Sequence, residues 1–178
     1  EAANDALGPD YCLQHLLNSP GNFTAAKLAW VKENEPDIYA RIAHVMLPGD
    51  YIAFRLTGTV TTTASGLSEG VFWDFSRNEL SQDLLNYFGF DRKFFNHQQD
   101  VFSVHGILSK ERAEELSLSA GIPVSYKAGD QPNNALSLGV ADPGEVAATA
   151  GTSGVIYAVS NQPAFDPLSR VNSFAHVN

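Results

Sequence analysis

Two short segments of the chain carry residue types suited to phosphoryl transfer. They are residues 128–131, which read Ala-Gly-Asp-Gln, and residues 150–154, which read Ala-Gly-Thr-Ser-Gly. The carboxylate of Asp130 in the first segment can accept the proton of an attacking hydroxyl. The glycines and hydroxyls of the second can wrap backbone N–H groups and O–H groups around phosphate oxygens. If both segments face one cleft, they form the centre of a kinase site.

Each segment also has a purely structural explanation. Asp130 stands between a predicted strand and a predicted helix, the position at which open α/β sheets place ligand-handling residues. The same position suits a helix N-cap, for which Asp is among the preferred residues. Gly, Thr and Ser also form ordinary turns, and residues 151–154 lack the Gly-Lys-Ser/Thr ending of a Walker loop. Pattern alone leaves both interpretations open for each segment.

Short helices and strands are expected to position these segments. A Thr-, Ser- and Gly-rich stretch, residues 57–66, predicts a loop or short strand, either a solvated connection or a wall facing a substrate. Strands are predicted over residues 44–47 and 123–128, and a β-hairpin pairs residues 145–150 with 155–160. Helices are predicted over residues 11–18, 24–38 with a break at Pro36, 48–56 ended by Gly58, 81–88, 110–118 and 133–138.

Composition and charge narrow the class of protein. The 178 residues are 44% hydrophobic and 17% charged, which is typical of a folded globular protein with one domain or one domain and part of another. The net charge of −9, from 20 acidic and 11 basic residues, would repel polyanions. Nucleic acid and anionic membranes are therefore not expected as partners, whereas a phosphate-bearing small molecule is allowed.

Cysteine and histidine usage argues against bound metals and disulfides. Cys12 is the only cysteine, so neither an internal disulfide nor a thiolate metal site is expected, which fits a reducing cytoplasm. The five histidines show no metal-ligand spacing. The pattern includes neither a membrane span nor a signal peptide. Because the chain starts at Glu1 without a Met and stops within an alternating apolar segment, we expect an internal fragment.

An ordered series of motifs resembles the FGGY family of carbohydrate kinases, and within it the series is most similar to the xylulokinases. The motifs run in family order across nearly the whole chain, an order that chance matches would not keep. They are residues 21–30 (GNFTAAKLAW), 35–39 (EPDIY), 47–52 (LPGDYI), 56–58 (LTG), 128–130 (AGD), 151–155 (GTSGV) and 172–176 (NSFAH).

The resemblance implies a partial α/β fold of the ribonuclease-H-like type, the actin- and hexokinase-like ATPase fold. In that family two such domains enclose a cleft. Residues 1–141 would be the C-terminal portion of the N-terminal domain, which binds sugar and carries the catalytic base. Residues 142–178 would begin the C-terminal, nucleotide-binding domain with its opening β-hairpin, and the Asp142-Pro143-Gly144 break would be the hinge region.

The resemblance also assigns roles. Asp130 would be the general base that takes a proton from the terminal hydroxyl of a ketopentose, D-xylulose, as it attacks the γ-phosphate of ATP. Asp130 and Gln131 would contact the sugar, and Gly151, Thr152 and Ser153 would contact the ATP phosphates. ATP would bring Mg²⁺ with it, no metal would be bound by the protein itself, and the enzyme would serve xylose metabolism in the cytoplasm. A homodimer is an assembly that the resemblance leaves open.

The chain departs from the family pattern after the base. The family commonly reads Gly-Gly-Asp-Asn-Ala-Ala-Gly, whereas residues 128–134 read Ala-Gly-Asp-Gln-Pro-Asn-Asn, so contacts made after Asp130 stay open. The family's N-terminal phosphate loop, several sugar-contacting residues and its adenosine-binding part are not in the sequence. The isolated chain is therefore expected to be inactive. The alternatives are a kinase for another sugar or polyol, such as glycerol, gluconate or a deoxyhexose, and a non-catalytic sugar-binding module.

Overall fold

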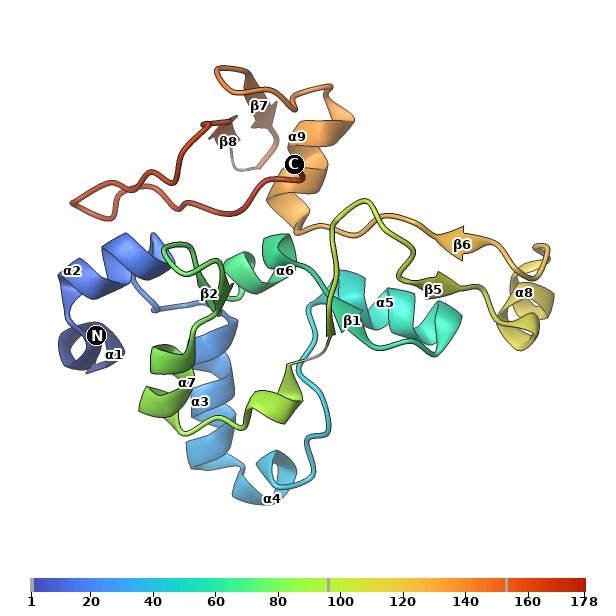
Figure 1. Ribbon diagram of the computed structural model, residues 1–178, viewed down its shortest axis with the longest axis horizontal. Helices are drawn as coiled ribbons and strands as arrows, with labels where there is room; N and C mark the ends of the chain where they lie inside the picture. The colour runs from blue at the N-terminus through green and yellow to red at the C-terminus, as the bar shows by residue number, and fades with distance from the viewer. Residues whose placement is uncertain (1, 96, 153) are drawn as a thin grey trace.

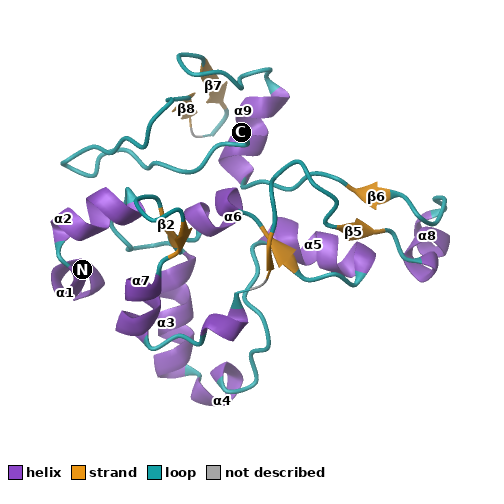
Figure 2. Ribbon diagram, in the orientation of Figure 1, coloured by secondary structure: helices purple, strands orange, loops and turns teal. Residues whose placement is uncertain are grey.

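The computed structural model describes residues 2–95, 97–152 and 154–178 of the chain. It is a mixed α/β structure of short elements (Figures 1 and 2). The helices are α1 (Ala2–Leu7), α2 (Pro9–Tyr11), the π-helical turn η1 (Cys12–Leu16), α3 (Thr24–Asn34), α4 (Pro36–Tyr39), α5 (Pro48–Thr57), α6 (Ala64–Glu69), α7 (Gln82–Phe88), the 3₁₀ turn η2 (Arg92–Phe94), α8 (Lys110–Leu116) and α9 (Asp130–Ser137).

Within the described ranges, each strand pairs with a single neighbour. β1 and β4 are parallel, and the other three pairs, β2 with β3, β5 with β6 and β7 with β8, are antiparallel. The strands are β1 (Thr61–Thr62), β2 (Trp73–Asp74), β3 (Glu79–Leu80), β4 (His97–Gln98), β5 (Gly106–Ile107), β6 (Pro123–Val124), β7 (Val146–Ala150) and β8 (Gly154–Ala158).

The main hydrophobic core lies in the N-terminal half of the chain. Leu28 of α3 and the adjacent leucines Leu84 and Leu85 of α7 are buried in it, together with Trp73. Lys32 of α3 donates from Nζ to the carbonyls at the end of α7, Phe88 O at 2.6 Å and Gly89 O at 2.7 Å. Those carbonyls have no partner within their own helix, so the lysine caps α7 and joins the two helices.

Local signals place most of the helix ends where the sequence predicts them. Pro48 opens α5, and Gly58 ends it in the left-handed region at φ 75°. Ser81 caps α7, since its Oγ accepts from Leu84 N at 3.3 Å, and Ser109 caps α8 in the same way. The predicted hairpin is also confirmed, with Val146 opposite Ala158 and Ala150 opposite Gly154.

The strand predicted over residues 44–47 is wrong. The segment is extended but does not pair as a strand; Val45 N donates to Phe94 O at 2.9 Å. A strand needs a neighbour that continues the ladder, and here the segment leads directly into α5 at Pro48. The strand predicted over residues 123–128 is right only for β6 at its start.

The Thr-, Ser- and Gly-rich stretch holds the most consequential error. The short strand is present as β1, but the next residues form helix α6 instead of a loop. Thr63 caps that helix, since its Oγ1 accepts from Gly66 N at 3.1 Å. Ser65 and Ser68 are buried, and Ser68 Oγ donates to Ser65 O at 2.8 Å. These hydroxyls bind backbone groups inside the fold, so the part of the stretch that forms α6 is not a solvated connection.

A second, smaller apolar cluster joins α9 to the hairpin. Ala135 of α9 and Val140 after it pack against Ala147 and Val159 of the hairpin, and Tyr157 packs against the cluster. Figure 1 shows α9 and the hairpin together, on the opposite side of α6 from the core helices α3 and α7. The helix that begins at Asp130 therefore connects the part of the chain before it, called the first body below, to the hairpin.

The helices of the described part of the chain are short. The longest, α3, has 11 residues. None of them combines the length and the apolar composition that a bilayer crossing requires.

Candidate active site

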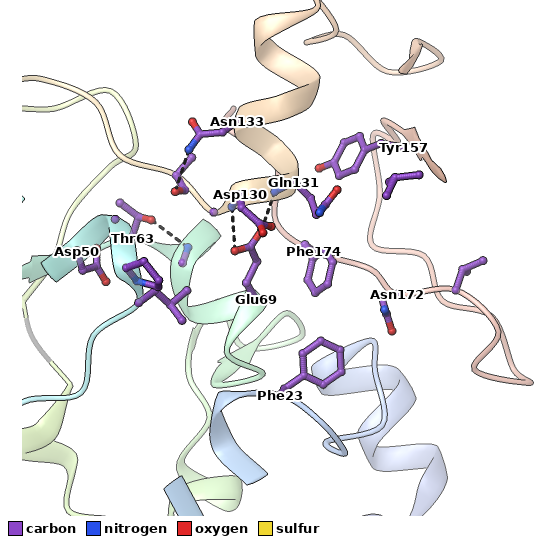
Figure 3. Close-up of a pocket in the computed structure, with 18 of the residues that line it drawn as sticks. Phe23, Asp50, Thr63, Glu69, Asp130, Gln131, Asn133, Tyr157, Asn172 and Phe174 are labelled. Carbon is purple, nitrogen blue, oxygen red and sulfur yellow. Dashed lines mark hydrogen bonds between the residues drawn. The ribbon is translucent and has the colours of Figure 1, made fainter. Parts of the chain in front are cut away.

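A cleft of about 900 Å³ lies between the first body of the chain and the hairpin. One wall comes from the start of α5, from α6 and from the start of α9. The facing wall comes from β8 and from residues 170–174 of the C-terminal segment (Figure 3). The predicted site residues Asp130 and Gln131 line this cleft.

Asp130 is the first residue of α9, and its side chain is exposed. The N-cap position belongs to Gly129, and no side chain of the helix start caps it locally. The structural explanation of Asp130 as an N-cap is therefore wrong, because the chain enters the helix one residue earlier. The carboxylate lies at the edge of the cleft, where a substrate can reach it.

Glu69 holds the start of α9 from another helix. Its Oε2 accepts from Asp130 N at 3.0 Å, and its Oε1 accepts from Gln131 N at 3.1 Å. One turn earlier in α6, the Oγ of Ser65 accepts from Gly129 N at 3.0 Å. Three consecutive backbone N–H groups around the predicted base are thus bound by side chains of α6. Figure 3 shows the two bonds that Glu69 accepts.

Gly129 is required for this approach. A Cβ atom at that position would overlap the carboxylate of Glu69. The absence of a side chain therefore lets the acid of α6 reach the backbone of α9, a close contact that only glycine permits.

The environment of Glu69 disfavours its charge. Burial raises the pKa of the Glu69 carboxyl to about 7; the two backbone N–H groups oppose this rise, and the neighbouring Asp130 carboxyl adds to it. Both acids line the same cleft, and the charge of Asp130 acts on the pKa of Glu69. No sequence motif signals this pair, since the two residues are 61 positions apart.

A buried ion pair supports the segment that leads to Asp130. Lys127 Nζ donates to Asp50 Oδ1 at 2.7 Å and to Thr61 O at 2.6 Å. The other carboxylate oxygen of Asp50 accepts from Thr62 Oγ1 at 2.8 Å. Both charged residues are 7% exposed. The pair connects α5 and β1 to the segment that leads to Asp130.

The predicted phosphate turn lies differently from the base. Gly151 and Thr152 are exposed and are not part of the cleft lining, and Ser153 lies outside the described residues. The cleft is lined instead by the strand that follows, from Gly154 to Tyr157. The structure thus brings Asp130 and Gln131 together with β8, including Gly154 at the end of the predicted turn, and it does not bring Gly151 or Thr152 into the same lining.

Tyr157 gives the hairpin wall a polar contact. Its hydroxyl lies 3.1 Å from His176 Nδ1, and burial raises the pKa of its phenol to about 12, with the charge of Glu69 adding to the rise. The phenol therefore stays protonated at neutral pH.

The C-terminal segment folds back over the first body. Asn18 binds Ser173 through both backbone groups, with Nδ2 donating to Ser173 O at 2.7 Å and Oδ1 accepting from Ser173 N at 3.0 Å. Ala175 N donates to Ser68 Oγ at 2.8 Å. These contacts set the ring of Phe174 beside that of Phe23, edge to face at 6.1 Å, where both line the cleft.

Comparison with known proteins identifies the family. Residues 14–137 match the model of the N-terminal domain of the FGGY family of carbohydrate kinases. This chain belongs to that family. The resemblance to this family that the sequence motifs carry is therefore confirmed.

The relatives of this FGGY chain include xylulose kinases. It is 33% identical over 160 residues to the xylulose kinase of Escherichia coli (strain K12), a match that covers 90% of this chain and 33% of that protein. It resembles the crystal structure of a "xyloylose kinase" from Brucella ovis with a TM-score of 0.86 and 35% identity, over 99% of this chain and 37% of that one. It also resembles the crystal structure of the xylulose kinase from Rhodospirillum rubrum with a TM-score of 0.89 and 26% identity, over 99% of this chain and 36% of that one.

These structural likenesses confirm the expected fold class, a partial chain of the actin- and hexokinase-like ATPase fold of sugar kinases. The chain spans about a third of the length of the relatives that it matches.

Proposed function

We propose that the protein to which this FGGY chain contributes transfers the γ-phosphate of ATP to the terminal hydroxyl of D-xylulose, giving D-xylulose 5-phosphate. The observation that carries the proposal is Asp130, an exposed carboxylate at the edge of a 900 Å³ cleft in a chain of this family. Relatives that carry the name xylulose kinase favour a ketopentose over other sugars.

In this mechanism Asp130 accepts the proton of the sugar hydroxyl as its oxygen attacks phosphorus. Phosphoryl transfer needs little covalent chemistry from the protein, so positioning and charge stabilisation dominate. A general base contributes roughly 10²- to 10⁴-fold. Gln131 is proposed to contact the sugar beside the base, and its place in the lining supports that role.

Gly151, Thr152 and Ser153 are proposed to contact the phosphates of ATP. What supports this role is the residue pattern of the turn, since its described residues are exposed beside the cleft. Closure of the hairpin wall on a bound nucleotide would bring the turn to the phosphates.

Mg²⁺ is proposed to arrive with the nucleotide. Asp50 of the cleft lining supports this, because its carboxylate is bound by Lys127 and Thr62. No cluster of three or more metal-ligating side chains occurs in the ranges that the structure describes. When bound, the ion would neutralise charge on the phosphates.

The domain division is proposed at Asp142, with residues 1–141 in the N-terminal domain and 142–178 opening the C-terminal one. The family match ending at residue 137 supports this boundary, as does the turn at Gly144. We also propose a cytoplasmic enzyme of xylose metabolism, supported by the use of ATP and by a single, buried Cys12. Sedimentation of the complete kinase tests whether it forms a homodimer.

The test is ATP-dependent phosphorylation with D-xylulose, glycerol, gluconate and a deoxyhexose as competing acceptors. The complete kinase is expected to use D-xylulose with the highest kcat/KM, and the 178-residue chain alone is expected to be inactive. A higher kcat/KM for another acceptor would overturn the choice of sugar. Sugar binding by calorimetry without any phosphorylation would favour a binding module instead.

A further inference from the structure

We propose that Glu69 is a positioning residue for the Asp130 base: from α6 it holds the first two backbone N–H groups of α9 and sets a second carboxylate beside that of Asp130. The inference rests on the proposed function of Asp130. The inference concerns which groups hold the backbone of Asp130 and which charge favours protonation of its carboxylate. Neither follows from the motif of residues 128–131.

The start of α9 lacks a local cap. The first N–H groups of a helix have no partner within it, and an N-cap side chain usually satisfies one of them. Gly129 occupies the N-cap and has no side chain to offer. Glu69 supplies both acceptors from a distance of 61 residues along the chain, at 3.0 and 3.1 Å. The orientation of the Asp130 backbone is therefore set by α6, not by its own helix.

The shapes of the two helices make this contact possible. Ser65 and Glu69 are four residues apart in α6 and lie on one face of it, so both reach the same stretch of backbone. The missing Cβ of Gly129 leaves the room that the Glu69 carboxylate fills. The Glu69 carboxylate thus packs directly against the backbone of Gly129.

The neighbouring carboxylates also have an electrostatic consequence. When Asp130 takes the proton of the sugar hydroxyl, its negative charge disappears beside the charge of Glu69. An ionised Glu69 therefore favours the state with the proton on Asp130, which is the state that the transfer approaches. A protonated Glu69 gives no such help. Because burial raises the pKa of Glu69 to about 7, the change between these two states falls near neutral pH.

Three other charged or titratable groups belong to the described cleft lining. They are Asp50 from α5, Tyr157 from β8 and Arg170 from the C-terminal segment. Asp50 is paired with Lys127. The Tyr157 phenol is neutral at pH 7, since burial raises its pKa to about 12. Arg170 is bound to Asp166, with Nε 2.7 Å from Oδ2.

The experiment compares Glu69→Gln with wild type in the complete kinase, with Glu33→Gln as a matched control. Glu33 is exposed on α3, away from the cleft. The amide of Glu69→Gln keeps the size and one acceptor but loses the charge and one backbone hydrogen bond. We expect kcat to fall about tenfold, with KM for ATP within about twofold of wild type. Glu33→Gln should leave both unchanged.

The pH profile separates positioning of the base from a general loss of structure. In the wild type kcat should rise as pH increases through about 7, because Glu69 ionises there. Glu69→Gln should lose this rise. The wild-type pH profile of kcat tests the inference without the variant, so the test remains possible even if Glu69→Gln folds poorly. A wild-type profile that is flat through this range, or an unchanged rise in Glu69→Gln, overturns the inference.

Hydrogen exchange tests the backbone contact without any turnover. Peptides that cover residues 128–137 should exchange faster in Glu69→Gln, by about tenfold at the start of α9, and at the wild-type rate in Glu33→Gln. Unchanged exchange overturns the positioning role. Wild-type turnover in Asp130→Asn would instead overturn the proposed function, and the exchange result would still decide whether Glu69 holds α9.

Discussion

The two segments that the sequence proposes for chemistry are held in opposite ways. The segment around Asp130, the proposed base, is fixed by other parts of the chain: Glu69 and Ser65 bind its backbone, and the Lys127–Asp50 pair anchors the residue three positions before Asp130. The turn at Gly151 and Thr152 is exposed, and its strands are held by their own ladder and by one small apolar cluster.

This difference matches the two proposed roles, a general base at Asp130 and a phosphate-binding turn at Gly151 and Thr152. A base must meet one proton in one geometry, so a rigid polar frame benefits it. In the proposed phosphate role, the turn would reach its ligand only when the cleft closes, so an exposed turn that can move would suit that role. Variants in the two segments test this comparison, from the largest expected effect to the smallest.

Replacing the base should have the largest effect. Asp130→Asn keeps the shape of the side chain but cannot accept the proton, so kcat should fall by roughly 10²- to 10⁴-fold in the complete kinase. KM for ATP should change little, because the nucleotide does not depend on this carboxylate. Steady-state assays with D-xylulose and ATP measure both constants.

Asp37→Asn is the matched control for Asp130→Asn. Asp37 is also an acidic residue in the first turn of a helix, but it lies in α4, outside the cleft. It should retain wild-type turnover. If Asp130→Asn retained it as well, the base would be another residue and the rigid frame around Asp130 would serve only structure.

Breaking the buried ion pair between Lys127 and Asp50 should have the next largest effect, a loss of stability. Lys127→Met leaves the carboxylate of Asp50 buried without its cation, which should lower the free energy of unfolding by roughly 3–5 kcal/mol. Urea titration of the 178-residue chain measures the loss. Lys93→Met, at an exposed pair with Asp91, should leave the unfolding midpoint close to that of wild type.

The double variant Lys127→Met/Asp50→Leu decides whether the pair acts as a unit. Removing both charges relieves the unpaired carboxylate, so much of the stability should return. A double variant less stable than Lys127→Met would mean that Asp50 contributes through contacts of its own, and the frame around the base would not depend on this pair.

Changing the turn should have the smallest effect. Thr152→Val removes one hydroxyl donor from an exposed position, so stability should be unchanged while KM for ATP rises roughly tenfold. The conservative substitution Thr152→Ser keeps the donor and should keep the wild-type KM. Equal kinetic constants in Thr152→Val and wild type would remove Thr152 from the phosphate site.

The local sequence predicted most of the helix ends and the β-hairpin. Pro48 and Gly58 bound α5, Ser81 and Ser109 cap their helices, and the hairpin pairs as the apolar runs on either side of residues 151–153 predict. Each of these features depends on a few neighbouring residues, which a sequence displays directly. The ordered motifs also indicated the FGGY family, which the match over residues 14–137 confirms.

The secondary-structure predictions are wrong where contacts with distant segments decide which structure forms. Residues 57–66 predicted a loop because Thr, Ser and Gly are poor helix formers. In the fold Thr63 caps α6, and burial of Ser65 and Ser68 against other segments makes the helix favourable. The strand predicted over residues 44–47 is wrong for the converse reason, because no neighbouring strand among the described residues pairs with that segment.

The sequence by itself determined the family, the helix ends, the hairpin and Asp130 as the candidate base, because each is written in adjacent residues or in an ordered series of motifs. Only the tertiary structure decided that Asp130 is not a helix cap and that Glu69 holds its backbone. The physical reason is that this cap is non-local: the acceptors for the N–H groups of α9 come from a helix 61 residues earlier, and only folding brings them within 3.1 Å.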